Sequence, residues 1–373
     1  MTPQPFRALY VHVPFCRLRK CGYCAFYSET AADAGRRGAY LERLVAEFSE
    51  FAPRAVVPLD SVFVGGGTPS CLTSAELRRL LAAVRGHFTL APDAEFSVEC
   101  NPESLTLRKA EILAAGGVTR LSLGVQSFDL RLRRAIGRCG SVATLPERVR
   151  ELRALGFRQL NLDLMNALPG QTLANWEDDL RRALDLGPDH LSTYSLTVEE
   201  HTALGKRGVE AADDRLAVAM WDAAERLARP AGLRRYEVSN LARPGCECRH
   251  NQDIWLGTPY LGCGPAACSF DGILRWSNPP SLARWLRPRC RREFDRLPPS
   301  RRAAEVLAFG LRTVRGWVPA RFRERTGFDY ADLRGPVLRR LVAQGLLYRD
   351  WERRLRPTRK GLLFHDTVAR ELL

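Results

Sequence analysis

Residues 8–24 read Ala-Leu-Tyr-Val-His-Val-Pro-Phe-Cys-Arg-Leu-Arg-Lys-Cys-Gly-Tyr-Cys, an apolar, strand-like run followed by Cys16, Cys21 and Cys24. Three thiolates are one ligand short of a closed four-coordinate site, so a metal or cluster that they hold keeps one position open for a ligand that is not protein. An open coordination position is typical of a reactive metal or cluster site rather than of a purely structural one. A zinc knuckle completed by a distant side chain, or three unrelated thiols, are the alternatives at this point.

A second strand-like run, residues 61–64, leads into Gly65-Gly-Gly-Thr-Pro69 about forty residues after the last of these cysteines. Consecutive glycines let a backbone approach a ligand closely, although such a loop by itself is more often a plain turn. The cysteine trio followed by this loop resembles the radical S-adenosylmethionine (SAM) superfamily. In that superfamily three cysteines hold a [4Fe-4S] cluster whose fourth iron binds SAM, and the glycine loop supports the methionine part of SAM.

The cysteine spacing departs from the usual C-x3-C-x2-C pattern of that superfamily. Four residues, rather than three, separate Cys16 from Cys21, whereas the two residues between Cys21 and Cys24 match the pattern. An extra loop residue can bulge outward without moving the outer ligands far. The resemblance therefore still implies that Cys16, Cys21 and Cys24 ligate the cluster.

The order of strand-like and helix-like segments predicts an α/β fold. Amphipathic helical stretches alternate with continuous apolar strands, which implies right-handed βαβ units and a parallel sheet covered by helices. Six units fit a partial (β/α)6 barrel better than a closed eight-stranded one. The expected strands are 9–13, 61–64, 95–100, 120–125, 159–165 and 190–198, and the expected helices are 36–50, 74–85, 107–115, 144–155 and 176–186.

Polar residues stand where these strands end, which is the end where barrel enzymes place their sites. Glu99 closes the third strand, Gln126 follows the fourth, and Arg138 comes twelve residues later. Asp163 lies within the fifth strand, where a carboxylate is costly unless it is paired or used. We expect these four side chains to form a polar ring around one mouth of the barrel.

Length and composition are typical of a cytoplasmic enzyme. The 373 residues suffice for one large and one small domain, and eleven cysteines without a secretory start favour a reducing compartment. No apolar run approaches the length of a membrane span. The net charge of +15 comes mainly from scattered arginines. We interpret these as solvated surface rather than as a nucleic-acid or anionic-membrane site.

Further motifs narrow the resemblance to oxygen-independent coproporphyrinogen III oxidases and their HemW-type relatives. The matching stretches lie at 10–16, 65–69, 99–103, 120–128, 161–164 and 168–172, and with later motifs they cover nearly the whole chain. The resemblance implies that SAM is contacted by Tyr10, Tyr23, Gly66, Gly67, Thr68 and Glu99. It also implies that Gln126, Arg138 and Asp163 bind SAM, either this molecule or a second one as in the oxidases.

Within the family, two features favour the HemW-type heme chaperones over the oxidases. The oxidases carry a further cysteine where this chain has Phe26, and they have a long extension before the first strand. The chaperones carry His-Asn-x-x-Tyr-Trp as a heme-binding motif, and residues 250–255 match it except for Ile254 in place of Tyr. The resemblance thus implies His250 as a heme ligand in a polar surface loop. Cys268 stands near a common histidine position and is expected to be a small buried cysteine.

From Pro288 onward the composition changes to arginine-rich helices and a hairpin-like pair at 346–357, without further strands of the barrel. We expect a barrel domain with the heme-loop segment at 1–285 and a small, mainly helical, winged-helix-like domain at 286–373. The predicted function is a heme chaperone with a [4Fe-4S] cluster, SAM and heme as cofactors. Its predicted partners are heme and heme-acceptor proteins, membrane-associated ones included, and no nucleic acid.

Three alternatives accompany this interpretation. A true coproporphyrinogen III oxidase is disfavoured by the missing cysteine, and a zinc- and nucleic-acid-binding protein is disfavoured by the SAM-loop residues. A peripheral location at the membrane is the alternative to a free cytoplasmic one. The oligomeric state is expected to be a monomer or a homodimer.

Overall fold

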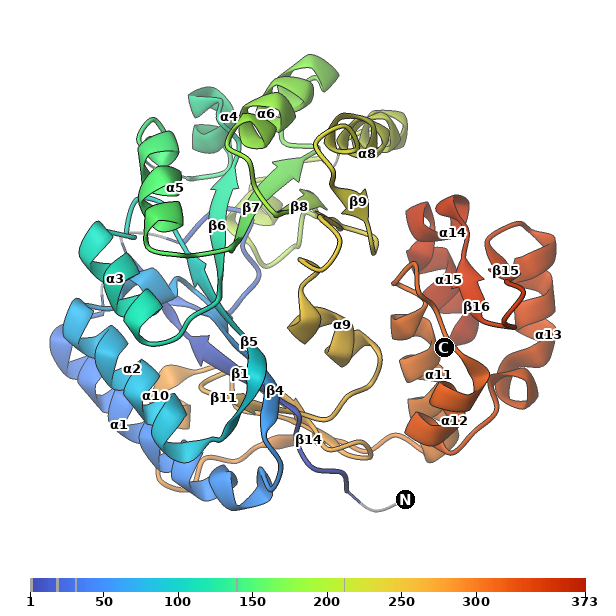
Figure 1. The fold of residues 1–373 in the computed structure, drawn as a ribbon, viewed down its shortest axis with the longest axis horizontal. Helices are drawn as coiled ribbons and strands as arrows, with labels where there is room; N and C mark the ends of the chain where they lie inside the picture. Colours follow the sequence, from blue (N-terminus) through green and yellow to red (C-terminus); the bar gives the residue numbers. More distant parts are fainter. Residues whose placement is uncertain (1–2, 18–19, 31, 139, 211) are drawn as a thin grey trace.

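The computed structural model describes residues 3–17, 20–30, 32–138, 140–210 and 212–373. Its centre is a curved sheet whose middle strands are parallel and follow the chain in order (Figure 1). All six predicted strands are confirmed: β1 (Ala8–Val13), β4 (Leu59–Gly66), β5 (Leu90–Cys100), β6 (Arg120–Gln126), β7 (Gln159–Asn166) and β8 (His190–Ser195). The α/β class and the partial barrel are therefore confirmed as well.

Short strands that were not predicted extend this sheet at both edges. Beyond β1 lie β11 (Tyr260–Cys263), parallel to it, and then the antiparallel strands β12 (Cys268–Phe270), β13 (Arg275–Ser277) and β14 (Glu293–Asp295). Beyond β8 lie β10 (Asn240–Ala242) and β9 (Arg234–Arg235). The expectation that no strand of the sheet follows Pro288 was wrong, because β14 pairs with β13.

The predicted helices cover the outer, convex side of the sheet, where Figure 1 shows them following its rim. They are α1 (Ala34–Phe51), α2 (Ser74–His87), α3 (Leu107–Ala115), α5 (Leu145–Ala154) and α6 (Leu173–Asp185), joined by α4 (Leu130–Ala135), α7 (Ala203–Lys206) and α8 (Asp214–Ala228). Side-chain caps set the starts of most of these helices, although α5 and α8 have none. Thr73 and Glu76 form a reciprocal capping box on α2, and Thr106 caps α3.

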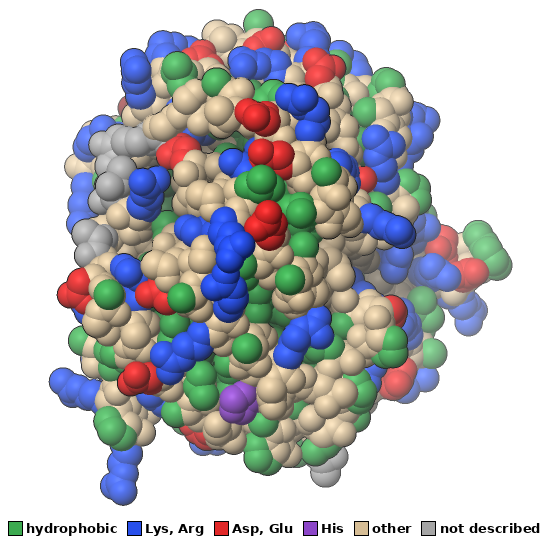
Figure 2. Space-filling view, turned by 60° about the vertical axis from the view of Figure 1, so that its left-hand side comes forward, with side chains coloured by type: hydrophobic (Ala, Val, Ile, Leu, Met, Phe, Trp, Pro, Cys, Tyr) green, Lys and Arg blue, Asp and Glu red, His purple; other side chains and the backbone are tan. Residues whose placement is uncertain are grey.

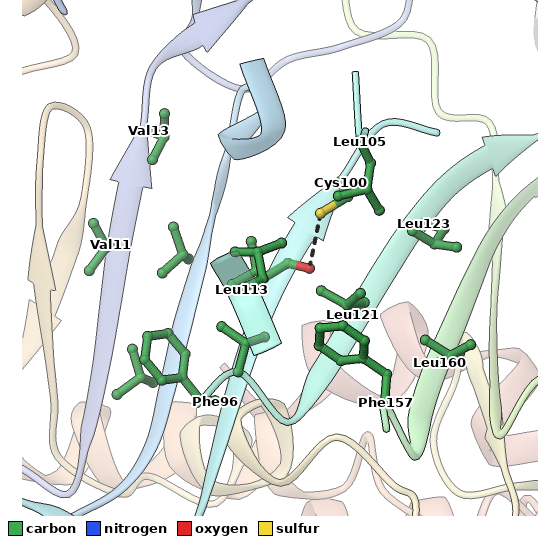
Figure 3. Close-up of a cluster of buried hydrophobic side chains, with 14 of the residues drawn as sticks. Val11, Val13, Phe96, Cys100, Leu105, Leu113, Leu121, Leu123, Phe157 and Leu160 are labelled. Atoms are coloured by element: carbon green, nitrogen blue, oxygen red, sulfur yellow. Dashed lines mark hydrogen bonds between the residues drawn. The ribbon is translucent and has the colours of Figure 1, made fainter. Parts of the chain in front are cut away.

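The strands alternate between apolar and polar side chains, so the expectation of continuous apolar strands was wrong. One side chain in two points outward and packs beneath the helices, as Val11, Phe96, Leu121 and Leu160 do in Figure 3. The intervening residues, such as Glu99, point to the opposite, concave side. The main core therefore lies between sheet and helices, and the concave side is free to carry polar groups.

Helix α9 (Arg249–Trp255) lies on the concave side, between the sheet and the C-terminal helices (Figure 1). The chain continues through α10 (Leu282–Trp285) to a second core, formed by α11 (Pro299–Gly310), α12 (Pro319–Thr326), α13 (Tyr330–Ala343), β15 (Leu347–Arg349), β16 (Leu355–Pro357), α14 (Arg359–Leu363) and α15 (His365–Leu372). Three helices before a two-stranded hairpin match the predicted winged-helix-like arrangement.

The face drawn in Figure 2 carries arginine and lysine side chains distributed over it with acidic side chains among them. Many surface arginines are paired, for example Arg37 with Glu76 at 2.9 Å. Within the described residues no helix has the length and apolar character that crossing a bilayer requires.

Candidate functional site

The cysteine loop is anchored from two sides. Cys16 ends β2 (Phe15–Cys16), which pairs with β3 (Glu29–Thr30). The buried Gly22 donates its amide hydrogen to the carbonyl of Ile136 (2.9 Å), and its own carbonyl accepts from the amide of Leu204 (2.8 Å). The three thiols on this loop are free and partly exposed: Cys16, Cys21 and Cys24. Burial raises the pKa of Cys24.

The thiols do not converge on one point. Across the described residues no three Cys, His, Asp or Glu side chains are close enough to ligate a single metal ion. A four-iron cluster does not need that convergence, because each thiolate binds its own iron. The chemistry of the donor set, three free and accessible thiols on one anchored loop, therefore fits a cluster.

The glycine loop crosses directly over the cysteine loop. The amide of Gly67 donates to Val13 (2.8 Å) and that of Thr68 donates to Phe15 (2.7 Å). A Cβ atom on Gly67 would lie 2.6 Å from the Phe15 carbonyl oxygen, and one on Gly66 would lie 2.6 Å from the His12 ring. Gly66 also has a φ of 108°, which favours glycine. Close backbone approach is thus the local reason for the run of glycines.

Two carboxylates point into the concave side above α9. Glu99 accepts the amide hydrogen of Gly66 at 3.0 Å, and burial together with the charge of Asp163 raises its pKa to about 8. Burial also raises the pKa of Asp163, against the hydrogen bonds that it accepts from Ser122 (2.9 Å) and Asn161 (2.7 Å). No arginine or lysine in the described part of the chain forms an ion pair with either group. The pair is suited to a ligand that brings positive charge or hydroxyl groups.

Arg138 links the cysteine loop to the sheet. Its guanidinium donates to Cys21 Sγ at 3.8 Å and to the carbonyl of Gly124. Its buried Nε has no hydrogen-bond partner among the described residues. Burial raises the pKa of Tyr23, whose hydroxyl lies in the field of Arg138, Cys21 and Asp163. The structure therefore brings Tyr23, Arg138 and Asp163 together beside the cysteine loop, and the guanidinium of Arg138 keeps one buried donor without a partner.

Gln126 is held in an unusual backbone conformation at the end of β6. Its φ is 70°, and the pairing of β6 with β7 shifts register between Gly124 and Gln126. A left-handed, non-glycine residue at a strand bulge is the kind of strained position that clusters at functional sites. Its side chain is 8% exposed.

Tyr10, on β1, has its hydroxyl 3.0 Å from Nδ1 of His12, whose Nε2 bonds the carbonyl of Tyr27 at 2.9 Å. A carbonyl can only accept, so Nε2 carries the hydrogen and Tyr10 donates to Nδ1. Burial raises the pKa of Tyr10, which keeps the hydroxyl protonated. His12 therefore holds Tyr10 against the segment that follows the third cysteine.

His250 does not lie in a surface loop, because residues 249–255 form α9. The side chain is 2% exposed, its Nδ1 lies 2.9 Å from Ser61 Oγ, and its ring stacks on Phe63 at 5.2 Å. Burial lowers its pKa to about 3, so the imidazole is neutral. Trp255, at the other end of α9, packs its ring against Arg312. Cys268, expected to be buried, is partly exposed and accepts from the Tyr260 hydroxyl at 3.6 Å.

Sequence reasoning missed Tyr194 of β8, which is 40% exposed and lies in the field of Asp163 and Glu99. It also missed His190, two positions before Ser192 on the same strand. The signal was available: polar residues at every second position of 190–194 mark the concave face of the strand.

Comparisons with known proteins agree with this arrangement. Residues 10–183 match the Radical SAM superfamily, and residues 297–364 match the HemN C-terminal domain. The "Heme chaperone HemW" of Mycobacterium tuberculosis is 37% identical over 399 residues, which cover 100% of this chain and 96% of that protein. The protein of that name from Lactococcus lactis is 32% identical over 98% of this chain and 96% of its own length.

A solved structure shows the same fold over the whole chain. Coproporphyrinogen III oxidase (HemN) from Escherichia coli superposes with a TM-score of 0.86 at 24% identity, covering 100% of this chain and 91% of the oxidase chain. By identity and coverage, the chain belongs to the HemW heme chaperone family of the Radical SAM superfamily.

Proposed function

We propose that the protein binds a [4Fe-4S] cluster, SAM and heme, and that it passes heme to acceptor proteins. The observation that carries the proposal is the meeting of three free thiols, a glycine loop and two unpaired carboxylates at one end of the sheet. The curated relatives that cover the whole chain are named heme chaperones. The acceptors are proteins that need heme, membrane-associated ones included.

The residues present fit the cluster and SAM. Cys16, Cys21 and Cys24 would hold the cluster, which supplies an electron to bound SAM. Gly66, Gly67 and Thr68 would lie along the methionine part of SAM, with Tyr10 and Tyr23 beside it. The unused Nε of Arg138 is a donor for a carboxylate, and Glu99, Gln126 and Asp163 offer oxygen acceptors to amino and hydroxyl groups.

Heme would bind at α9. Ile254 and Trp255 line a cleft of about 220 Å³ together with aromatic side chains from β11, β12 and α11, among them Phe309, which is 46% exposed. The Arg275–Glu305 ion pair lines the cleft as well, so the cleft offers an aromatic face to the macrocycle beside a charged edge. His250 stays the proposed axial ligand. Since its ring lies beneath Phe63, ligation requires α9 to shift away from the sheet.

The cluster is tested by anaerobic reconstitution. Wild-type protein is expected to bind about four irons per chain and to absorb broadly near ~400 nm, as thiolate-bound clusters do. Alanine at Cys16, Cys21 or Cys24 should abolish both signals. Cys290→Ala is the matched control, because this partly exposed thiol lies at the edge of the main core and accepts a hydrogen bond from Arg43. Bound zinc and no cluster after reconstitution would contradict the proposal.

Heme is tested by titration into the reconstituted protein, followed by its Soret absorption. We expect about one heme per chain, an altered Soret band in His250→Ala, and weaker binding in Trp255→Ala. His201→Ala, at an exposed histidine, serves as the control. An anaerobic assay with coproporphyrinogen III runs in parallel, and decarboxylated product would replace the chaperone proposal by an oxidase. Identical Soret spectra for wild type and His250→Ala would remove His250 from the heme site.

A further inference from the structure

A chain of hydrogen bonds runs under the concave face from Asp163 to the N-cap residue of α9. Asn161 Nδ2 donates to Asp163 Oδ1 at 2.7 Å, and Asn161 Oδ1 lies 2.6 Å from His190 Nδ1. His190 Nε2 lies 2.8 Å from the hydroxyl of Tyr236, which accepts the amide hydrogen of Cys248 at 3.3 Å. Cys248 is the N-cap residue of α9. We call these residues the relay.

The register between β7 and β8 brings the relay residues of these two strands next to each other. Asn161 and Asp163 are two apart on β7 and therefore share a face. In the parallel pairing of β7 with β8, Asn161 stands opposite His190 and Asp163 stands opposite Ser192. The side chains of Asn161 and His190 are 2% and 1% exposed. Because unpaired polar groups are costly at such depth, their bonding pattern is specified rather than incidental.

The donor and the acceptor in every bond of the relay can be assigned, because the carboxylate at one end can only accept and the backbone amide at the other end can only donate. The carboxylate of Asp163 only accepts, so Asn161 presents its amide nitrogen there and its oxygen to His190. His190 must then donate from Nδ1, which leaves Nε2 to accept from the hydroxyl of Tyr236. That hydroxyl in turn accepts from the Cys248 amide. Successive donors pointing the same way polarise one another, so a change at one end is felt at the other.

The relay is not the only anchor of α9. Glu95, on β5, accepts the amide hydrogens of Arg249 at 2.9 Å and of His250 at 3.2 Å. These bonds hold the first turn of the helix to a strand without passing through Asp163. The bond between Cys248 and Tyr236 is thus a separate connection, and its loss leaves the helix attached through Glu95.

We infer that His190 is a positioning residue that couples SAM binding at Asp163 to the position of α9. The inference rests on the proposed function, because it takes SAM as the ligand of Asp163. When α9 moves, the Cys248 amide leaves the Tyr236 hydroxyl, and His190 then fixes the side-chain oxygen of Asn161 less firmly. Ser122 and Ser192 still bond the Asn161 amide, at 2.7 Å and 3.0 Å, so its bond to Asp163 is weakened rather than lost. By reciprocity, bound SAM holds α9 in place with His250 buried.

The first test measures SAM affinity by equilibrium dialysis on anaerobically reconstituted protein. His190→Leu removes both bonds of the imidazole and is expected to weaken SAM binding about tenfold. His190→Asn keeps a donor at the position of Nδ1 and is expected to retain most of the affinity. If His190→Leu and His190→Asn both fold and lose the same amount of SAM affinity, His190 has only a structural role and the inference is overturned. An affinity within about twofold of wild type in His190→Leu would overturn it as well.

The second test measures hydrogen exchange of the amides of residues 248–255 with and without SAM. Wild type should exchange several-fold more slowly when SAM is bound. In Tyr236→Phe, which loses one buried hydroxyl, this dependence on SAM should disappear. Tyr330→Phe is the matched control, because that hydroxyl bonds the carbonyl of Arg353 in the C-terminal core and its loss leaves the dependence intact.

The outcomes separate the inference from the proposed function. Reconstituted wild type that fails to bind SAM would contradict the proposed function and the inference together. Two outcomes in a wild type that binds SAM would overturn the inference alone. One is that amide exchange in α9 is the same with and without SAM, and the other is that exchange in Tyr236→Phe still depends on SAM. Should His190→Leu not fold, Tyr236→Phe decides.

Discussion

Glu99 is a buried carboxyl whose pKa lies well above that of a free glutamate. Burial and the charge of Asp163 raise its pKa to about 8, and the amide of Gly66 opposes this shift. In the unfolded chain the same carboxyl titrates near ~4.3. Between these two values the folded protein keeps the proton that the unfolded chain has released. Deprotonation therefore costs the folded state, and this contribution to stability is lost as pH rises from about 5 to about 8.

A neutral amide at this position removes that penalty. We expect the free energy of unfolding of cluster-free Glu99→Gln, relative to wild type, to increase by roughly 1–3 kcal/mol between pH 5 and pH 8.5. Urea unfolding at both pH values measures it. Glu50→Gln is the control. The hydrogen bond from Arg292 lowers the pKa of Glu50, so this carboxyl is ionised in both the folded and the unfolded state between pH 5 and pH 8.5. The difference in unfolding free energy between Glu50→Gln and wild type should therefore not change over this range. Parallel pH profiles for wild type and Glu99→Gln would show that Glu99 ionises freely.

At the scale of elements, the glycine loop and the cysteine loop form one unit. Backbone bonds from Gly67 and Thr68 to the strand that leads into Cys16 tie the end of β4 to the cysteine loop. The position of the proposed SAM loop therefore depends on the same contact as the position of the first cysteine. A change in one loop would therefore also move the other.

A methyl group at Gly67 breaks this contact. Gly67→Ala places a Cβ 2.6 Å from the carbonyl oxygen of Phe15, a backbone atom that cannot turn aside. We expect a loss of about 1–3 kcal/mol in unfolding free energy, as in other overpacked sites, and loss of SAM binding. Gly86→Ala, in α2 with nothing within 4 Å of its Cβ, should instead be neutral or slightly stabilising. Circular dichroism and SAM dialysis measure both. Normal SAM affinity in Gly67→Ala would contradict the argument.

The long elements could be predicted from the sequence, and the short ones could not. β4 to β8 have outward apolar residues and helices between them, so their positions follow from pattern alone. β9 and β13 have two or three residues, too few to show a period, and they exist because a neighbouring edge is there to pair with. Helix α9 lacks an apolar period, and its start is held by Glu95 from a strand far away in sequence.

The candidate site follows the same rule. The strand-end argument places Glu99, Gln126 and Asp163 at one edge of the sheet, whereas Arg138 reaches the Gly124 carbonyl from the segment after α4. Their role in binding SAM stays a prediction. The burial of His250 was not, because it depends on α9 folding back against Phe63.

At the scale of the whole molecule, an ion pair with a buried carboxylate is among the contacts that join the C-terminal helices to the sheet region. Arg312 Nε lies 2.6 Å from Glu237 Oε2, and the side chain of Glu237 is fully buried. The amide of Val314 also donates to the carbonyl of Tyr236 at 2.9 Å. Arg312 further packs on Trp255 of α9. The two cores and α9 therefore meet at this arginine.

Removal of Arg312 leaves a buried carboxylate without its partner. We expect Arg312→Ala to lower the unfolding free energy by about 2–4 kcal/mol and to increase cleavage by protease between the two cores. Urea unfolding and limited proteolysis measure this. Arg340→Ala breaks the exposed pair with Glu371 and should cost less than about 1 kcal/mol. Equal, small effects of both changes would mean that Glu237 takes up a proton and needs no partner.

The place of β1 in the sheet has a consequence for synthesis. One edge of β1 pairs with β4, but its other edge pairs with β11, about 250 residues later in the chain. A ribosome adds about 5–20 residues per second, so this edge waits roughly 12–50 seconds for its partner. During that interval the strand that leads into Cys16 offers unpaired backbone groups to any other strand nearby. The segment that leads into the proposed cluster ligands is thus made first but is among the last to be enclosed, and the nascent chain needs its C-terminal half before this edge can be covered.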